Sequence, residues 1–184
     1  MKKPIEQGRI SSGYGLRINP ITKKEHFHGG LDIVPTTEDK KIVFPLPGKI
    51  EAFGFSKTFG NRIWVRINMP DNEKYHKKFY VLAHMDSLAE GLYNLKSVKA
   101  GEFAGICGST GNSTGTHLHF EIANTVNDER KPIEPTEFVK MYAEKSEEKP
   151  KKIEEIKELK QIEASEIENK TQEVKEKKSK KAEK

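Results

Sequence analysis

In the segment from Thr116 to Ile122, polar and apolar residues alternate from His117 onward, and this period is the feature that most narrowly limits the fold. Successive side chains of a β-strand point to opposite faces of a sheet, so the segment predicts a strand with one polar and one apolar face. The polar face presents His117, His119 and Glu121, and the apolar face presents Leu118, Phe120 and Ile122. The two imidazoles then lie about 6 to 7 Å apart on one face.

Further strand patterns precede this segment. Apolar residues recur at β spacing between Ile42 and Ile67, with turns at Pro47–Gly48 and Gly60–Asn61. Residues 79–85 read as another strand, and a turn and strand end at Cys107. We therefore expect a mainly β fold built on an antiparallel sheet.

Three connecting segments complete the domain. Residues 70–78 predict a charged hairpin, and residues 87–95 predict a short turn of helix. Residues 135–142 predict a short closing helix. We expect the folded domain to span residues 8–143.

The last 41 residues differ sharply in composition from the rest. Residues 144–184 contain 13 lysines and 12 glutamates, so 25 of 41 positions are charged, against 36 of the preceding 143. Apolar residues recur every third position in part of this tail, which is a drifting helical pattern and not a heptad seam: Ile153, Ile156, Leu159 and Ile162. The tail is then either a disordered linker or a helix that binds a protein partner.

The charge distribution argues against nucleic acid as a partner. The net charge of the whole chain is +5, of which +4 lies before residue 144. Arginines and lysines form no dense block with interleaved aromatic residues. The remaining charge predicts a mild attraction to polyanions that carry phosphate or carboxylate groups.

Cysteine content and hydropathy leave the cellular compartment open. Cys107 is the single cysteine, so an intramolecular disulfide is excluded. No transmembrane stretch is expected, and Met1 to Gln7 lack the apolar run of a secretory signal in the chain as given. An exported location would then need a removed leader, a carrier protein, lysis or a phage particle.

Three histidine-containing pieces stand out chemically. The first is His28-Gly29-Gly30-Leu31-Asp32, in which two glycines allow an imidazole and a carboxylate to converge, although a surface turn would look the same. His117 and His119 form the second piece, which an ordinary exposed strand could also carry. His84 is the third, on an apolar strand where a histidine could simply belong to the core.

Together these pieces fit a catalytic zinc site. Such a site takes three ligands from His, Asp or Glu and keeps a fourth position for water, whose pKa falls to about 7. Further histidines can then move protons, because the unperturbed pKa of histidine lies near neutrality. Spacing alone does not decide which histidines bind the metal.

The same pieces resemble the lysostaphin-like zinc metallopeptidases of bacterial cell walls. That family carries HxxxD, a strand that ends in His followed by Leu or Met, and a Gly-Ser-Thr-Gly segment that leads into HxH. In this chain these are His28 to Asp32, Leu82 to Met85, and Gly108 to His119. The resemblance runs from about Gly8 to Ile122, and Ser12 to Thr22 look like the entry segment of the family.

The resemblance implies specific roles and a specific fold. His28, Asp32 and His119 would bind one zinc ion per chain, and His84 with His117 would act as the catalytic pair. The family fold is a mainly antiparallel β-sheet with a substrate groove, built from two related β-rich halves (a duplicated hybrid motif).

Other residues receive weaker expectations. Arg17 and Asn19 could line the groove and hold a peptide carbonyl or carboxylate, or could equally be structural. His26 and His76 match nothing in the family pattern and are expected in solvated loops. Leu82 stands where relatives commonly have Tyr, and we expect it to alter the groove wall.

The function that the resemblance implies is zinc-dependent endopeptidase activity on the stem peptides or cross-bridges of peptidoglycan. The activity would be extracytoplasmic, in the cell wall, the periplasm or a phage particle. The alternative is a non-catalytic module on the same fold that binds peptidoglycan or regulates a partner hydrolase. Such relatives lose ligands, whereas this chain retains all five residues.

Overall fold

The computed structural model describes residues 1–18, 23–126 and 129–143. All its strands belong to one compact unit, Met1–Tyr142. The predicted tail, residues 144–184, lies outside the described residues, and its helical or disordered character stays a prediction. Among the described ranges, no helix combines the length and apolar character that crossing a bilayer requires.

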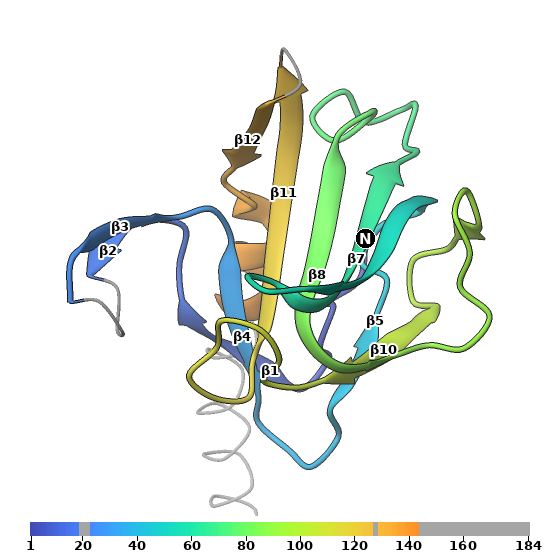
Figure 1. Cartoon of the computed structure of the whole chain (residues 1–184). Helices are drawn as coiled ribbons and strands as arrows, with labels where there is room; N and C mark the ends of the chain where they lie inside the picture. Colours follow the sequence, from blue (N-terminus) through green and yellow to red (C-terminus); the bar gives the residue numbers. More distant parts are fainter. Residues whose placement is uncertain (19–22, 127–128, 144–184) are drawn as a thin grey trace, which may run out of the picture. The chain divides into compact units, whose positions relative to one another are not determined.

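A ten-stranded antiparallel sheet dominates the fold (Figure 1). Its main path runs through β1 (Gly8–Ser12), β4 (Leu31–Pro35), β11 (Leu118–Val126), β8 (Phe79–Leu88), β7 (Gly60–Ile67), β6 (Gly48–Ser56) and β9 (Ser97–Val98). Off this path, β10 (Phe103–Cys107) pairs with β8 and β5 (Lys41–Val43), and β12 (Glu129–Ile133) pairs with β11. The mainly β, antiparallel prediction is confirmed.

A separate two-stranded hairpin stands beside the large sheet. It consists of β2 (Gly15–Ile18) and β3 (Glu25–His28), and it projects to the left of the sheet in Figure 1. Arg17 pairs across this hairpin with His26, and β3 ends at His28. The hairpin therefore leads directly into the HxxxD segment.

The two faces of β11 differ as the alternation predicts. Leu118, Phe120 and Ile122 are fully buried in the hydrophobic core. His119 and Glu121, on the opposite face, are also buried, but they line a pocket. One face of the central strand thus holds the fold together, and the other is available for chemistry.

The short helix expected at residues 135–142 is present at residues 136–143. Phe138 and Tyr142, four residues apart, lie on one side of it and pack against the core. The Tyr142 hydroxyl donates a hydrogen bond of 2.6 Å to the carbonyl of Ile5. This bond ties the helix to the N-terminal segment.

The helical turn expected at residues 87–95 is wrong. β8 continues to Leu88, and turns follow it. Ser87 and Leu88 pair with Ile106 and Gly105 of β10. The sheet therefore satisfies the backbone hydrogen-bonding groups of Ser87 and Leu88, and a helical turn is not needed to do so. Residues 70–78 do connect the antiparallel strands β7 and β8, although Tyr75 within them is buried.

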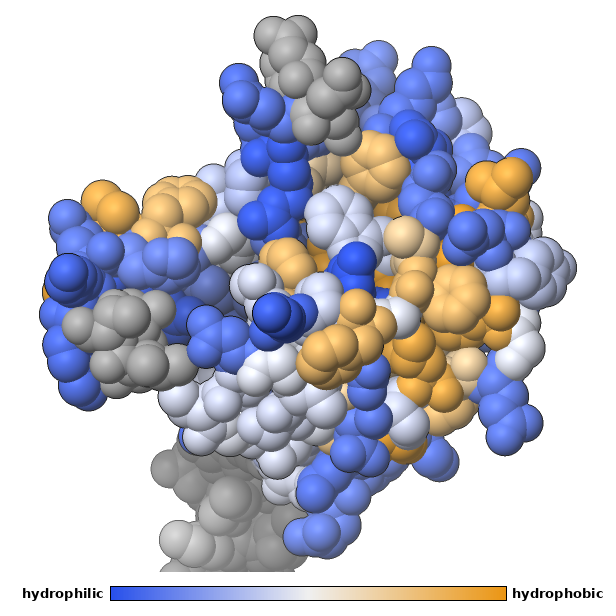
Figure 2. Space-filling model, viewed as in Figure 1, coloured by the Kyte–Doolittle hydropathy of each residue, from blue (hydrophilic) through white to orange (hydrophobic). Residues whose placement is uncertain are grey.

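Some of the exposed apolar side chains lie on two pairs of antiparallel strands (Figure 2). Leu16, Ile18 and Phe27 project from the β2–β3 hairpin, and Phe53 and Phe55 project from β6.

Candidate active site

The two glycines between His28 and Asp32 allow the segment that joins β3 to β4 to pass closely along β11. A Cβ atom at Gly30 would lie 2.4 Å from the carbonyl oxygen of Phe120, closer than any side chain tolerates. A Cβ at Gly29 would lie 2.9 Å from the ring of Pro132. The glycines thus let the imidazole of His28 and the carboxylate of Asp32 reach the same point.

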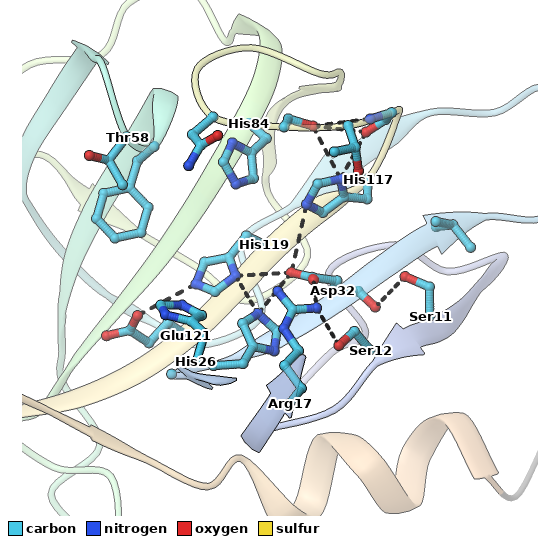
Figure 3. Close-up of a pocket in the computed structure, with 18 of the residues that line it drawn as sticks. Ser11, Ser12, Arg17, His26, Asp32, Thr58, His84, His117, His119 and Glu121 are labelled. Carbon is cyan, nitrogen blue, oxygen red and sulfur yellow. Dashed lines mark hydrogen bonds and ion pairs between the residues drawn. The ribbon is translucent and has the colours of Figure 1, made fainter. Parts of the chain in front are cut away.

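His28, Asp32 and His119 form a compact group of metal-ligating atoms (Figure 3). Asp32 of β4 and His119 of β11 are direct cross-strand neighbours. The Oδ1 atom of Asp32 lies 3.0 Å from both His28 Nε2 and His119 Nδ1, which are themselves 3.0 Å apart. All three side chains are buried, so little solvent competes for their lone pairs.

Hydrogen bonds decide which nitrogen of each imidazole faces this group. His28 Nδ1 lies 2.6 Å from the carbonyl oxygen of Gly13, which only accepts, so Nδ1 carries the proton and Nε2 keeps its lone pair. His119 Nε2 lies 3.5 Å from a carboxylate oxygen of Glu121, which favours a proton there and a lone pair on Nδ1. Two nitrogen lone pairs and a carboxylate oxygen then converge, a donor set that suits zinc.

The electrostatics of the group favour a positive charge at its centre. Burial alone would raise the pKa of Asp32, but hydrogen bonds with His119 and His28 outweigh burial and hold that pKa far below its usual range. Burial would lower the pKa of His119, whereas its bonds with Asp32 and Glu121 raise it above the ordinary value. The anionic carboxylate therefore attracts a proton or a metal cation to this point.

His84 and His117 lie next to each other beside the group, with ring centroids 4.8 Å apart and ring planes tilted by 51°. The Nδ1 atom of each lies 2.8 Å from a backbone carbonyl oxygen, that of Thr110 for His84 and that of Gly115 for His117. Each ring thus carries its proton on Nδ1 and keeps the Nε2 lone pair. His117 Nε2 lies 3.7 Å from Asp32 Oδ1, so this pair adjoins the group of potential ligands.

The backbone at His84 is strained. Its φ of 60° lies in the left-handed region that residues with a Cβ rarely adopt, and its N–H donates to the carbonyl of Phe59 at 2.8 Å. The pairing of β7 with β8 shifts register on the adjoining stretch. Burial lowers the pKa of His84 to about 4, so the ring is neutral at pH 7.

A chain of four polar contacts crosses the floor of the pocket. Arg17 Nη1 lies 3.0 Å from Asp32 Oδ2, and Asp32 Oδ1 lies 3.0 Å from His119 Nδ1. Beyond the 3.5 Å contact of His119 with Glu121, Glu121 Oε2 lies 3.1 Å from Arg130 Nη1. Each buried carboxylate is thus paired with an arginine from a different part of the chain.

These residues surround a cavity of about 500 Å³. The four histidines and the aspartate expected in the site all line this one cavity, and Arg17 lines it too. Sequence reasoning did not place Phe59 or Arg130 there, and no local pattern marks either residue. Glu121 could have been found, because it alternates with His119 on the polar face of the strand.

The structure agrees with some of the expectations for the remaining residues and differs from others. Arg17 lines the pocket, whereas Asn19 lies outside the described residues. His26 is exposed but belongs to β3 and lines the pocket, and His76 is half-buried with no partner for Nδ1 among the described residues. The groove-wall expectation for Leu82 is wrong: Leu82 pairs with Phe120 and is fully buried in the core. The left-handed backbone at His84 breaks the alternation, so His84 lines the pocket although it lies two residues from Leu82.

Comparison with curated proteins gives relatives that are much longer than this chain. The DD-carboxypeptidase/endopeptidase Mpg of Neisseria meningitidis is 31% identical over 119 residues, which cover 65% of this chain and 25% of that protein. Lysostaphin of Staphylococcus staphylolyticus is 31% identical over 131 residues, which cover 70% of this chain and 25% of that protein. The chain thus spans about a quarter of the length of these relatives.

Solved structures and family models agree with this likeness. The catalytic domain of lysostaphin from Staphylococcus simulans superposes with a TM-score of 0.57 at 28% identity, covering 72% of this chain and 92% of that domain. The model of peptidase family M23 matches residues 26–135, which is more than half of the chain. This range includes the four histidines and the aspartate of the site. The chain therefore belongs to peptidase family M23.

Proposed function

We propose that this chain is a zinc-dependent endopeptidase that hydrolyses peptide bonds in peptidoglycan stem peptides or cross-bridges. The observation that carries the proposal is the convergence of three potential ligand atoms beside two further histidines in one open pocket. The names of the relatives, an endopeptidase and lysostaphin, support the same reaction class. Peptidoglycan lies outside the cytoplasmic membrane, so we place the activity there.

His28, Asp32 and His119 would hold one zinc ion through Nε2, Oδ1 and Nδ1 respectively. When bound, zinc supplies a water of pKa about 7 and a Lewis acid for the scissile carbonyl. Arg17 occupies Asp32 Oδ2, so Oδ1 is the oxygen left to face the metal. The hydrogen bonds of His28 to Gly13 and of His119 to Glu121 fix both rings in the ligating tautomer.

His84 and His117 would manage the proton and the developing oxyanion. Because both rings keep their Nδ1 protons on backbone carbonyls, each presents Nε2 as the atom that can accept a proton. His84 is neutral at pH 7, so its Nε2 lone pair is free, but burial makes this ring a weak base. An imidazolium that forms on either ring can then donate to the leaving amine or stabilise negative charge on the carbonyl oxygen.

The test combines metal analysis with product analysis. Purified protein should contain one zinc per chain and release peptide fragments from purified sacculi of several cross-link types, with the cleaved bond identified by mass spectrometry. Chelation should abolish release, and zinc should restore it. A protein that binds zinc yet releases nothing from any sacculus would favour the non-catalytic module instead.

A further inference from the structure

The charged groups around the pocket are unequally exposed. Among the described residues that line it, the only acidic side chains are Asp32 and Glu121, whose side chains are 10% and 2% exposed. The side chains of Arg17 and Arg130 are 29% and 38% exposed. The cavity therefore presents its positive charges to a ligand and keeps its negative charges beneath them.

The two arginines are held in place without using all their donors. The contacts of Arg17 with Ser12 and Asp32, and that of Arg130 with Glu121, all go through Nη1. A guanidinium carries five N–H donors on three nitrogens. Nε of Arg17 is buried and has no hydrogen-bond partner among the described residues, and the Arg130 guanidinium lies over the ring of Phe59 at 5.1 Å.

The balance of charges around the pocket favours an anionic group on the ligand. Each carboxylate is neutralised by one arginine, so a bound divalent cation leaves the group with net positive charge. A planar guanidinium binds a carboxylate through two parallel hydrogen bonds, which a neutral amide cannot match. Arg17 contacts Asp32 at one end of the chain of contacts, and Arg130 contacts Glu121 at the other end. The potential metal ligands Asp32 and His119 therefore lie between the two arginines.

We propose that this pocket selects peptides that carry a carboxylate close to the scissile bond, and that the guanidinium of Arg130 or of Arg17 binds this carboxylate. The inference rests on the proposed peptidase function and narrows its substrate class. Stem peptides with an ionised glutamate α-carboxylate or a free C-terminal carboxylate fit the pocket. Neutral glycine bridges and amidated stem peptides carry no anionic group along the peptide that the arginines could bind.

The test uses matched synthetic stem peptides and the zinc-loaded full chain. One pair differs only in an α-carboxylate against an α-carboxamide on the glutamate, and a second pair differs only in a C-terminal carboxylate against a carboxamide. We expect kcat/KM to favour the carboxylate by at least about tenfold in one of the two pairs, which also identifies where the carboxylate lies. That preference should shrink as ionic strength rises from about 0.01 M to about 0.15 M.

Two variants assign the effect to an arginine. Arg130→Gln should lower the ratio of the two kcat/KM values towards one, and the ratio cancels any general loss of rate. Lys131→Gln is the matched control, because it removes the same charge from the next position of β12, which is exposed and does not line the pocket. Arg17→Gln is the parallel variant, and a lowered ratio there assigns the carboxylate to Arg17; zinc content is measured beside it because Arg17 contacts Asp32.

The outcomes separate this inference from the proposed function. Cleavage of carboxylate and carboxamide peptides at equal rates would overturn the inference while the peptidase function stands. Equal ratios in wild type, Arg130→Gln and Arg17→Gln would show that the arginines only pair with Asp32 and Glu121. Failure to cleave any peptide or sacculus would overturn the proposed function and the inference with it.

Discussion

Asp32 and His119 face each other across β4 and β11, with Oδ1 of the aspartate 3.0 Å from Nδ1 of the histidine. This cross-strand pair brings together two sequence motifs that lie 87 residues apart. The antiparallel register of the two strands fixes the distance, so backbone pairing and not loop conformation builds this half of the site.

Gly30→Ala should disturb both the fold and the ligand group. The added Cβ would lie 2.4 Å from the backbone oxygen of Phe120, and backbone cannot yield as a flexible side chain would. We expect a loss of about 1–3 kcal/mol in the free energy of unfolding, measured with urea, together with weaker zinc binding.

The matched control for that substitution is Gly13→Ala, because a Cβ at Gly13 meets nothing within 4 Å. It should unfold within about 0.5 kcal/mol of the wild type. Equal stability of both variants would show that Gly30 does not pass β11 as closely as the structure has it.

Glu137 should make stability depend on pH in the acid range. Burial raises the pKa of Glu137, but hydrogen bonds from Lys74 and Tyr75 outweigh burial and bring it to about 2. A carboxyl whose folded pKa is depressed contributes stability above its unfolded pKa, and the contribution is lost as pH falls from about 4.5 to about 2. Glu137→Gln should therefore be less stable than wild type at pH 6, and the gap should close by pH of about 2.

Urea unfolding in the presence of a chelator measures this gap without a contribution from metal release. Glu134→Gln is the control, because that exposed side chain lies beside the same helix. A gap that stays constant between these pH values would mean that Glu137 gains nothing from Lys74 and Tyr75 when ionised.

Removal of residues 144–184 should leave the peptidase unit intact. Every buried core residue of the described chain lies in Met1–Tyr142, and 25 of the 41 removed residues are charged. We expect the chain that ends at Ala143 to keep its urea midpoint, its zinc and its turnover of small peptides. Loss of zinc or of folding would show that the tail belongs to the core.

The sequence was most informative where local periodicity and tertiary burial agree. The alternation in Thr116 to Ile122 predicted both faces of β11, since one face meets the core and the other the pocket. The glycines after His28 predicted a close approach that Gly30 shows against Phe120.

Other features depend on tertiary contacts that no local pattern records. Leu82 lies on the core face opposite Phe120, and the left-handed backbone of His84 places that next-but-one side chain in the pocket, which period-two reasoning cannot foresee. Arg130 reaches the pocket because β12 pairs with β11 and its guanidinium meets Glu121. Ser87 and Leu88 pair with β10 where a helical turn was predicted, and this pairing is a long-range contact.

The division of roles between the two histidines of the HxH motif is the central claim of the proposed mechanism. His119→Ala removes Nδ1 from the ligand group and should abolish zinc binding and turnover together. His117→Ala and His84→Ala should keep zinc, because their rings lie beside the ligand group and not in it, while turnover falls roughly a hundredfold or more.

Zinc content and turnover, measured together for these three purified variants, test this division of roles. We predict a metal-free, inactive His119→Ala protein and zinc-loaded, slow His117→Ala and His84→Ala proteins. A zinc-loaded His119→Ala protein together with a metal-free His117→Ala protein would contradict the assignment of the metal ligands.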